Sequence, residues 1–317
     1  MANPTQGGYK MLIDRLIARI TELHCPIAVG LDPRLDQIPS YIKEAAFAKH
    51  GKTPAAVAEI FYTFNTAIID AVCDIVPAVK AQIAMYEKFG TAGMDVYFRT
   101  IAYAKSKGLI AIGDIKRNDI TSTAEAYSNA HIGRVDIEGE SVEIAQTDFI
   151  TINPYMGFDS VEPFLADCKK YDKGLFILVK TSNKGSADVQ DVITKEGHHI
   201  YTHVGKLVES WGVELIGESG YSNIGAVVGA THPLEALRLR QRMPRTFFLV
   251  PGYGAQGGNG ESLKDLWAKN YGAIVNNSRG ITGAYQTEKY KCDEKDFAAA
   301  GRQAVLDMKE DIGAYIS

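Results

Sequence analysis

Eight short apolar segments alternate with amphipathic stretches along the chain, and this pattern restricts the possible folds more than any other feature. The segments are rich in branched side chains and end in polar or glycine-containing sequence, as buried strands do. Strands are expected at 26–33, 76–83, 109–115, 148–153, 174–181, 224–230, 246–251 and 272–277. Helices are expected at 9–23, 54–74, 92–107, 121–133, 200–211, 232–242, 261–269 and 293–313. Such alternation predicts an α/β protein with a parallel sheet. Eight repeats favour a closed (β/α)₈ TIM barrel over the alternative, an open doubly wound sheet.

The 317 residues show no change of composition and no linker, so we expect one barrel domain over residues 1–317. Polar stretches at 34–53, 183–199 and 209–223 are expected to be long loops, and inserted loops are expected at the carboxyl-end face of the barrel. The first eight residues contain two glycines and no apolar core, and we expect them to be flexible.

Composition excludes several classes of protein. The net charge of −4 and the lack of a basic tract argue against a nucleic-acid partner. No segment approaches 18 uninterrupted apolar residues, so no membrane span or membrane partner is expected. The four cysteines, at positions 25, 73, 168 and 292, form no metal-binding or redox spacing. That pattern favours reduced thiols and a cytoplasmic location.

Charged residues gather at the ends of the first three expected strands. Asp114 and Lys116 lie two apart and therefore share one face of the third strand, and Asp119 follows in the loop. Lys80 lies on the second strand and Asp32 at the end of the first. A structural ion pair is the alternative interpretation, because buried opposite charges must be paired. Two lysines among three carboxylates exceed the needs of one such pair, which favours a functional site.

The loops after the last strands suit an anion. A glycine-rich segment, 251–258, follows the seventh strand, and Arg279 follows the eighth. Glycines let backbone N–H groups approach a phosphate, and an arginine adds two charge-assisted bonds. Turn formation is the alternative explanation for the glycines. Ser182 and Asn183, after the fifth strand, either contact a polar ring or form an ordinary turn.

No metal-ligand spacing, Walker loop, GxSxG or HExxH motif occurs in the sequence, and no cofactor motif is present. We therefore expect neither a metal nor a cofactor, and the hydrolase and NTPase classes lack their residues.

In combination, these motifs resemble those of the orotidine 5′-monophosphate decarboxylase family. The resemblance depends on Asp114-x-Lys116-x-x-Asp119, on Lys80 one strand earlier, and on the segments 30–33 (Gly-Leu-Asp-Pro) and 251–258 (Pro-Gly-Tyr-Gly-Ala-Gln-Gly-Gly). The Asp-x-Lys-x-x-Asp motif alone is shared with a wider barrel superfamily, whereas its combination with the glycine-rich segment is specific. The long loops are similar to those of the longer bacterial branch.

The resemblance implies decarboxylation of orotidine 5′-monophosphate (OMP) to uridine 5′-monophosphate (UMP) and CO₂, the last step of UMP synthesis, without metal or cofactor. It implies that Lys116 protonates C6 of the pyrimidine and that Asp114 lies beside the substrate carboxylate. It further implies that Asp32 and Lys80 hold the ribose hydroxyls and that Ser182 contacts the pyrimidine amide.

For the rest of the site, the resemblance implies that Gln256 and Arg279 bind the phosphate. It also implies a homodimer, because Asp119 and Thr123 match residues that reach into the neighbouring subunit's site. Lys184 departs from the proline that some members carry after Ser-Asn.

Three rival functions remain open. A Mg²⁺-dependent sugar-phosphate decarboxylase or aldolase of the same superfamily shares the Asp-x-Lys-x-x-Asp motif, but it needs a glutamate near the second strand. Glu87 lies beyond that position. A Schiff-base aldolase needs a lysine among apolar groups, and here both lysines are flanked by acids. The third rival is a non-catalytic nucleotide-binding barrel.

Overall fold

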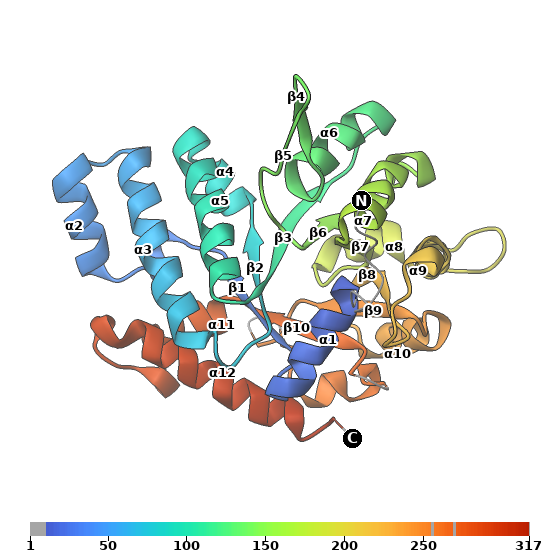
Figure 1. Ribbon diagram of the computed structural model, residues 1–317. Coiled ribbons are helices and arrows are strands. Elements are labelled where there is room, and N and C mark those ends of the chain that lie inside the picture. The colour runs from blue at the N-terminus through green and yellow to red at the C-terminus, as the bar shows by residue number, and fades with distance from the viewer. Residues whose placement is uncertain (1–10, 255–256, 269–270, 317) are drawn as a thin grey trace.

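The computed structural model describes residues 11–254, 257–268 and 271–316, so the expected flexibility of residues 1–8 falls outside the described residues. Eight parallel strands form a closed barrel in the order β1-β10-β9-β8-β7-β6-β3-β2 (Figure 1). These strands are β1 (Ile27–Leu31), β2 (Ala78–Gln82), β3 (Ile110–Arg117), β6 (Phe149–Ile152), β7 (Gly174–Lys180), β8 (Ser222–Val228), β9 (Thr246–Val250) and β10 (Ala273–Asn277). The predicted (β/α)₈ barrel is confirmed, and the open doubly wound sheet is wrong.

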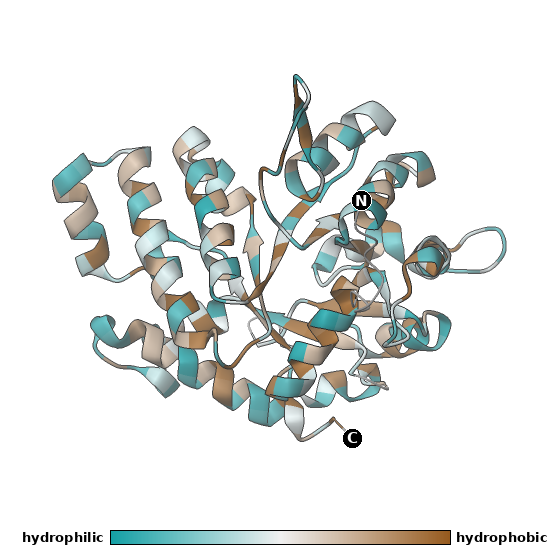
Figure 2. Ribbon diagram, in the orientation of Figure 1, coloured by the Kyte–Doolittle hydropathy of each residue, from teal (hydrophilic) through white to brown (hydrophobic). Residues whose placement is uncertain are grey.

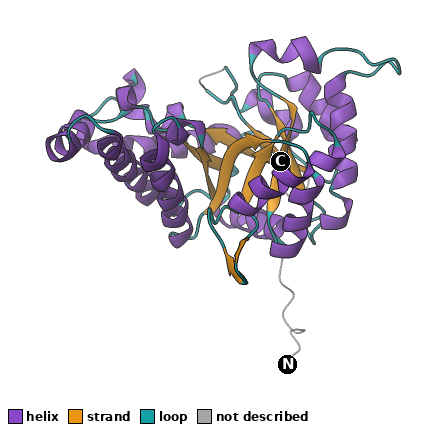
Figure 3. Ribbon diagram, turned by 90° about the horizontal axis from the view of Figure 1, so that it is seen from above, coloured by secondary structure: helices purple, strands orange, loops and turns teal. Residues whose placement is uncertain are grey.

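Helices surround the strands on the outside of the barrel (Figure 3). They are α1 (Leu12–Leu23), α2 (Ser40–His50), α3 (Pro54–Val72), α4 (Ala84–Glu87), α5 (Gly90–Ser106), α6 (Thr121–His131), α7 (Glu162–Tyr171), α8 (Ala187–Gln190), α9 (Ile200–Trp211), α10 (Pro233–Arg242), α11 (Arg279–Thr282) and α12 (Phe297–Gly313). Where a helix was expected over 261–269, the structure has a 3₁₀ helix, Glu261–Leu266.

Two longer helices, α2 and α7, three four-residue helices, α4, α8 and α11, and a hairpin were not expected from the sequence. Helix α2 lies inside the polar stretch 34–53 and buries only Ile42 and Ala46, and α7 buries only Phe164 and Cys168. A single apolar pair four residues apart gives too little periodicity to detect. Strands β4 (Val135–Ile137) and β5 (Glu140–Val142) form a hairpin that projects from the body between α6 and β6 (Figure 1).

The interior of the barrel is apolar at its amino end. Along the strands, alternate side chains point inward and pack on the apolar face of α1. The inward and helix side chains include Ala28, Ala78, Ile112, Phe149, Phe176, Phe247, Leu12, Leu16 and Ile20. Because α1 and these side chains fill the amino-terminal half, the carboxyl ends of the strands are left to form a site.

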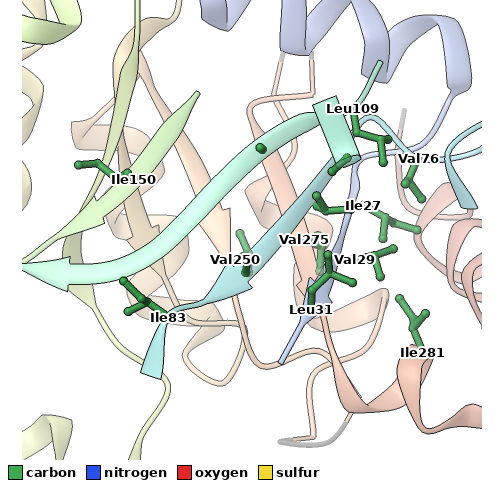
Figure 4. Close-up of a cluster of buried hydrophobic side chains, with 14 of the residues drawn as sticks. Ile27, Val29, Leu31, Val76, Ile83, Leu109, Ile150, Val250, Val275 and Ile281 are labelled. Carbon is green, nitrogen blue, oxygen red and sulfur yellow. The ribbon is translucent and has the colours of Figure 1, made fainter. Parts of the chain in front are cut away.

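A second, larger apolar cluster lies between the barrel and its helices. Figure 4 shows part of it, where Ile27, Val29 and Leu31 of β1 lie near Val275 and Ile281. Apolar residues are frequent along the strands, whereas the helices alternate apolar and polar residues (Figure 2). The strands are therefore buried on both faces, as expected for a parallel barrel.

Helix α3 is long and apolar enough to cross a membrane by length and composition alone, with 19 residues and a mean hydropathy of 1.3. It packs against α2, α5 and α12, and 56% of the apolar stretch is buried inside the protein. A core helix passes the same test, and the packing of α3 accounts for its apolar composition.

Candidate active site

Side chains alternate between the two faces of each strand, and this alternation brings polar side chains into the carboxyl-terminal half of the barrel interior. On β2, Ala78 belongs to the interior cluster and Lys80 follows two residues later; on β3, Ile112 and Asp114 have the same relation. Residues two apart on a strand share a face, so Lys80 and Asp114 point inward above the apolar layer. Both are almost completely buried, with 4% and 6% of their surface exposed.

The carboxylate of Asp114 accepts four hydrogen bonds. Oδ2 accepts from Lys80 Nζ at 2.8 Å and from Gln82 Nε2 at 3.0 Å. Oδ1 accepts from Lys116 Nζ at 2.5 Å and from Thr151 Oγ1 at 2.8 Å. Burial by itself raises the pKa of Asp114, but the attraction of Lys80 and Lys116 outweighs it and holds the pKa well below its usual range. The group is therefore a fixed negative charge.

Lys80 connects Asp114 to a second carboxylate. Its Nζ lies 3.8 Å from Oδ1 of Asp32, and Oδ2 of Asp32 accepts a hydrogen bond from Ser278 Oγ at 2.7 Å. Burial lowers the pKa of Lys80, but the carboxylates of Asp114 and Asp32 outweigh it and raise the pKa. Lys80 is thus a permanently charged ammonium inside the barrel.

Lys116 differs from Lys80 in its accessibility and in its backbone. Its side chain is 44% exposed, whereas that of Lys80 is 5% exposed. Its φ angle is +48°, in the left-handed region that a residue with a side chain rarely adopts. At this place β3 bulges against β6, because Gly113 pairs with Ile150 and Arg117 already pairs with Ile152. Strain of this kind often marks a functional position.

A cavity of about 740 Å³ opens at the carboxyl ends of the strands. Its described lining includes Asp32, Lys80, Asp114, Lys116, Thr151, Leu178, Thr181, Ser182, Asn183, Val227, Leu249, Asn276, Ser278 and Arg279. Leu178, Val227 and Leu249 give it an apolar floor, and charged groups line its sides. Its volume suits a ligand the size of a nucleotide.

The structure brings most of the expected site residues to this cavity. Ser182 and Arg279 border it together with Lys116, on strand ends that are remote in sequence. Asp119 and Thr123 are not among its described lining residues. Asp119 lies in the loop after β3, where its Oδ1 accepts a hydrogen bond from the backbone N–H of Ile120 at 2.8 Å.

One expected phosphate ligand, Gln256, lies outside the described residues. The segment before it, Pro251, Gly252 and Tyr253, borders the cavity. The start of the glycine-rich segment and Arg279 therefore lie at the same opening.

Three site residues were not predicted. Gln82 and Thr151 both donate to Asp114, and Ser278 donates to Asp32. Two of them were detectable by the period of two: Gln82 lies two residues after Lys80, and Thr151 lies two after the inward-facing Phe149. Ser278 lies just past the end of β10, where that period gives no signal.

The chain is similar to known proteins of one family. Residues 55–291 match the family model described as "Orotidine 5'-phosphate decarboxylase / HUMPS family". Orotidine 5′-phosphate decarboxylase from Clostridium tetani is 44% identical over 303 residues, which make up 95% of this chain and 98% of the relative. The enzyme of the same name from Petrotoga mobilis is also 44% identical over 303 residues, with the same coverage of 95% and 98%.

Solved structures give the same result. The structure of Leishmania donovani OMP decarboxylase matches with a TM-score of 0.70 and 30% identity, covering 96% of this chain and 98% of that one.

Proposed function

The chain belongs to the orotidine 5′-phosphate decarboxylase family and converts OMP to UMP and CO₂ in pyrimidine biosynthesis; on that premise we propose how its own residues perform the reaction. The observation that carries the proposal is the single carboxylate of Asp114, held between the ammonium groups of Lys80 and Lys116 at a cavity that Arg279 borders.

Lys116 is the proton donor. Loss of CO₂ from C6 leaves an electron pair in the plane of the pyrimidine ring, where no π system receives it. An ammonium fixed beside C6 is attracted more strongly as negative charge localises there, and it then gives up its proton. The exposure of Lys116 to the cavity supports this role, whereas Lys80 is enclosed between two carboxylates.

Asp114 lies beside the substrate carboxylate. It stays ionised because four donors saturate its oxygens. The two like charges repel each other in the bound substrate, and the repulsion is relieved as CO₂ departs. Asp32 and Lys80 hold the ribose hydroxyls, and Ser182 contacts the pyrimidine amide from the opposite wall.

The phosphate is held by Arg279, together with Gln256. One lysine cannot supply a barrier reduction that reaches about 23 kcal/mol for efficient enzymes. Binding energy from the non-reacting phosphate therefore orders the loops around the site and holds C6 against Lys116.

The active form is a homodimer in which Asp119 and Thr123 complete the neighbour's site. Support comes from a cluster of exposed apolar side chains beside them, here called the loop patch: Ile120 (57% exposed), Tyr155 (84%), Met156 (47%) and Phe158 (46%). The two loops that carry the loop patch are joined by a hydrogen bond from Asn118 Nδ2 to Ser160 Oγ at 2.8 Å. Exposed apolar clusters of this kind mark interaction surfaces.

A cytoplasmic location is supported by the cysteines. All four are free thiols, and two of them, Cys25 and Cys168, are buried.

The test is the ultraviolet change of OMP incubated with pure protein and a chelator. We expect conversion to UMP at the same rate with and without the chelator. Loss of activity in the chelator that Mg²⁺ restores would support the metal-dependent rival instead. Glu87, the acid nearest to that rival's ligand position, is already bound to Arg117 at 2.7 Å.

A further inference from the structure

Thr151 occupies a central position among the charged groups without being charged itself. It lies on β6, is 1% exposed, and borders the active-site cavity. Its hydroxyl donates to Oδ1 of Asp114 at 2.8 Å and accepts from the backbone N–H of Lys116 at 3.0 Å. A hydroxyl has one hydrogen to donate, and here that hydrogen goes to the carboxylate. The direction of both bonds is therefore fixed.

The second of these bonds compensates for the bulge in β3. Between the pairs Gly113–Ile150 and Arg117–Ile152, three residues of β3 lie opposite one residue of β6, and that residue is Thr151. The N–H of Lys116 finds its acceptor in the side chain of Thr151. The hydrogen bond is partly buried, and a backbone N–H left there without an acceptor is costly, so this bond favours the left-handed backbone at Lys116.

We propose that Thr151 is a positioning residue for the decarboxylation: its one hydroxyl fixes both the orientation of the Asp114 carboxylate and the backbone from which the Lys116 ammonium projects. The inference rests on the proposed role of Lys116 as proton donor. Thr151 acts through these two residues.

The reason for a catalytic effect is geometric. The charge of Lys116 stabilises the C6 electron pair only if the ammonium is already in place, because reorientation during the reaction costs free energy. Without the hydroxyl, Oδ1 loses one of its two donors and the N–H of Lys116 loses its acceptor. The backbone of the bulge then relaxes, and the Lys116 ammonium moves away from C6. A small displacement of a reacting group is enough to slow the reaction.

The test compares two substitutions at one position. Thr151→Val keeps the shape and removes the hydroxyl, and Thr151→Ser keeps the hydroxyl and removes the methyl group. We expect Thr151→Val to lower kcat about 10- to 100-fold with KM for OMP changed less than about 3-fold. Thr151→Ser is expected to keep kcat within about 3-fold of wild type. Thr151→Ala serves as a second hydroxyl-free variant if the valine variant does not fold.

A second readout isolates the proton transfer. By microscopic reversibility, an enzyme that protonates C6 also exchanges the C6 hydrogen of UMP with D₂O, and NMR measures this exchange without decarboxylation. The exchange rate is expected to fall in parallel with kcat in Thr151→Val, while the dissociation constant of UMP stays within about 3-fold. A merely structural role would not slow exchange at unchanged UMP affinity.

Thr147 provides a matched control. It precedes β6, is fully buried, and donates its hydroxyl to the backbone carbonyl of His131. Thr147→Val removes a buried hydroxyl two residues before the start of β6, away from the active-site end of the strand, so it is expected to lower the melting temperature and leave kcat unchanged.

The proposal is overturned if Thr151→Val, or Thr151→Ala in its place, keeps kcat within about 3-fold of wild type, or if Thr151→Ser is as slow as Thr151→Val. A different variant tests the proposed role of Lys116. If Lys116→Ala retains activity or C6 exchange, Lys116 is not the proton donor. An inactive Lys116→Ala with an unaffected Thr151→Val removes only the inference about Thr151.

Discussion

Ser278 donates its hydroxyl hydrogen to Oδ2 of Asp32 at 2.7 Å, although the two residues are 246 positions apart in the sequence. The bond joins the end of β10 to the end of β1, the seam where the barrel closes. It leaves the other oxygen of Asp32 for Lys80, at 3.8 Å. The contact therefore orients a site carboxylate at the seam, where β1 and β10 pair.

Gly30 is the residue that makes this contact possible. A Cβ atom at Gly30 would lie 1.8 Å from Oγ and 2.7 Å from Cβ of Ser278. We expect Gly30→Ala to displace Ser278, to lower the free energy of unfolding by about 1–3 kcal/mol, and to raise KM for OMP because Asp32 loses its partner. Urea denaturation and steady-state kinetics measure both effects. Gly313→Ala is the control, since nothing lies within 4 Å of a Cβ there, and equal stability of the two variants would contradict the prediction.

Replacing Lys116 is expected to separate chemistry from binding. Lys116→Ala removes both the charge beside C6 and the proton, so we expect kcat to fall by about 10⁴-fold or more. UMP binding, measured by calorimetry, is expected to survive, because Arg279 and Ser182 are untouched. Lys169→Ala is the control, since the Lys169 side chain is 67% exposed and paired with Glu214. A Lys116→Ala enzyme with wild-type turnover would refute the assignment.

Arg279 is expected to act on the phosphate alone. Loss of two charge-assisted hydrogen bonds in Arg279→Ala predicts a fall of about 10²- to 10³-fold in kcat/KM for OMP. The bare nucleoside orotidine lacks the phosphate, and its slow turnover is expected to change little. Arg34 also borders the cavity, and its guanidinium lies 3.4 Å from Asp36, so Arg34→Ala is the matched control. If both substrates lose activity equally, Arg279 does not bind the phosphate.

The sequence was sufficient for the barrel and for the charged array because both follow from local periodicity. Lys80, Asp114 and Lys116 were identifiable as charges at strand ends, and the structure brings them together. The left-handed backbone of Lys116 and its hydrogen bond to Thr151 were not predictable. They arise from a bulge where β3 pairs with β6. A change of register depends on how two strands pair, so the sequence of one strand does not reveal it.

The β4–β5 hairpin was missed for a different reason. Its turn has Glu138 at φ +52° and Gly139 at φ +94°. Asparagine or aspartate followed by glycine is the usual signal for two consecutive left-handed residues, and Glu138 does not provide it. Residues that break a local preference are the ones that sequence patterns miss.

The shared site is testable by mixing two inactive chains. Chains with Lys116→Ala and chains with Asp119→Ala are co-expressed; in a mixed dimer, one site carries both substitutions and the other carries neither. Random pairing then predicts recovery of about one quarter of wild-type activity. Each variant expressed alone is the control and is expected to be inactive. No recovery, despite mixed dimers detected by mass spectrometry, would argue against a site shared between subunits.

The stability of the protein is expected to fall in mild acid because of His131. Burial and, to a lesser degree, the charge of Arg117 lower the pKa of this imidazole to about 4, although Glu87 acts in the opposite direction. The unfolded chain has the ordinary pKa of about 6.5, so below that pH the unfolded state binds a proton that the native state does not. The stabilisation is complete above about pH 6.5 and is lost as the pH falls through 4, amounting to about 3 kcal/mol.

Urea denaturation at pH values between 7.5 and 4 measures this loss. His131→Gln removes the titrating group, so its free energy of unfolding is expected to depend less on pH over that range, whatever its value at pH 7.5. If His131→Gln keeps the full slope, the buried ring of His131 is protonated in the native state or another group causes the loss. Acid titration of Asp114 does not mimic the effect, because its lowered pKa confines its contribution to pH values below about 4.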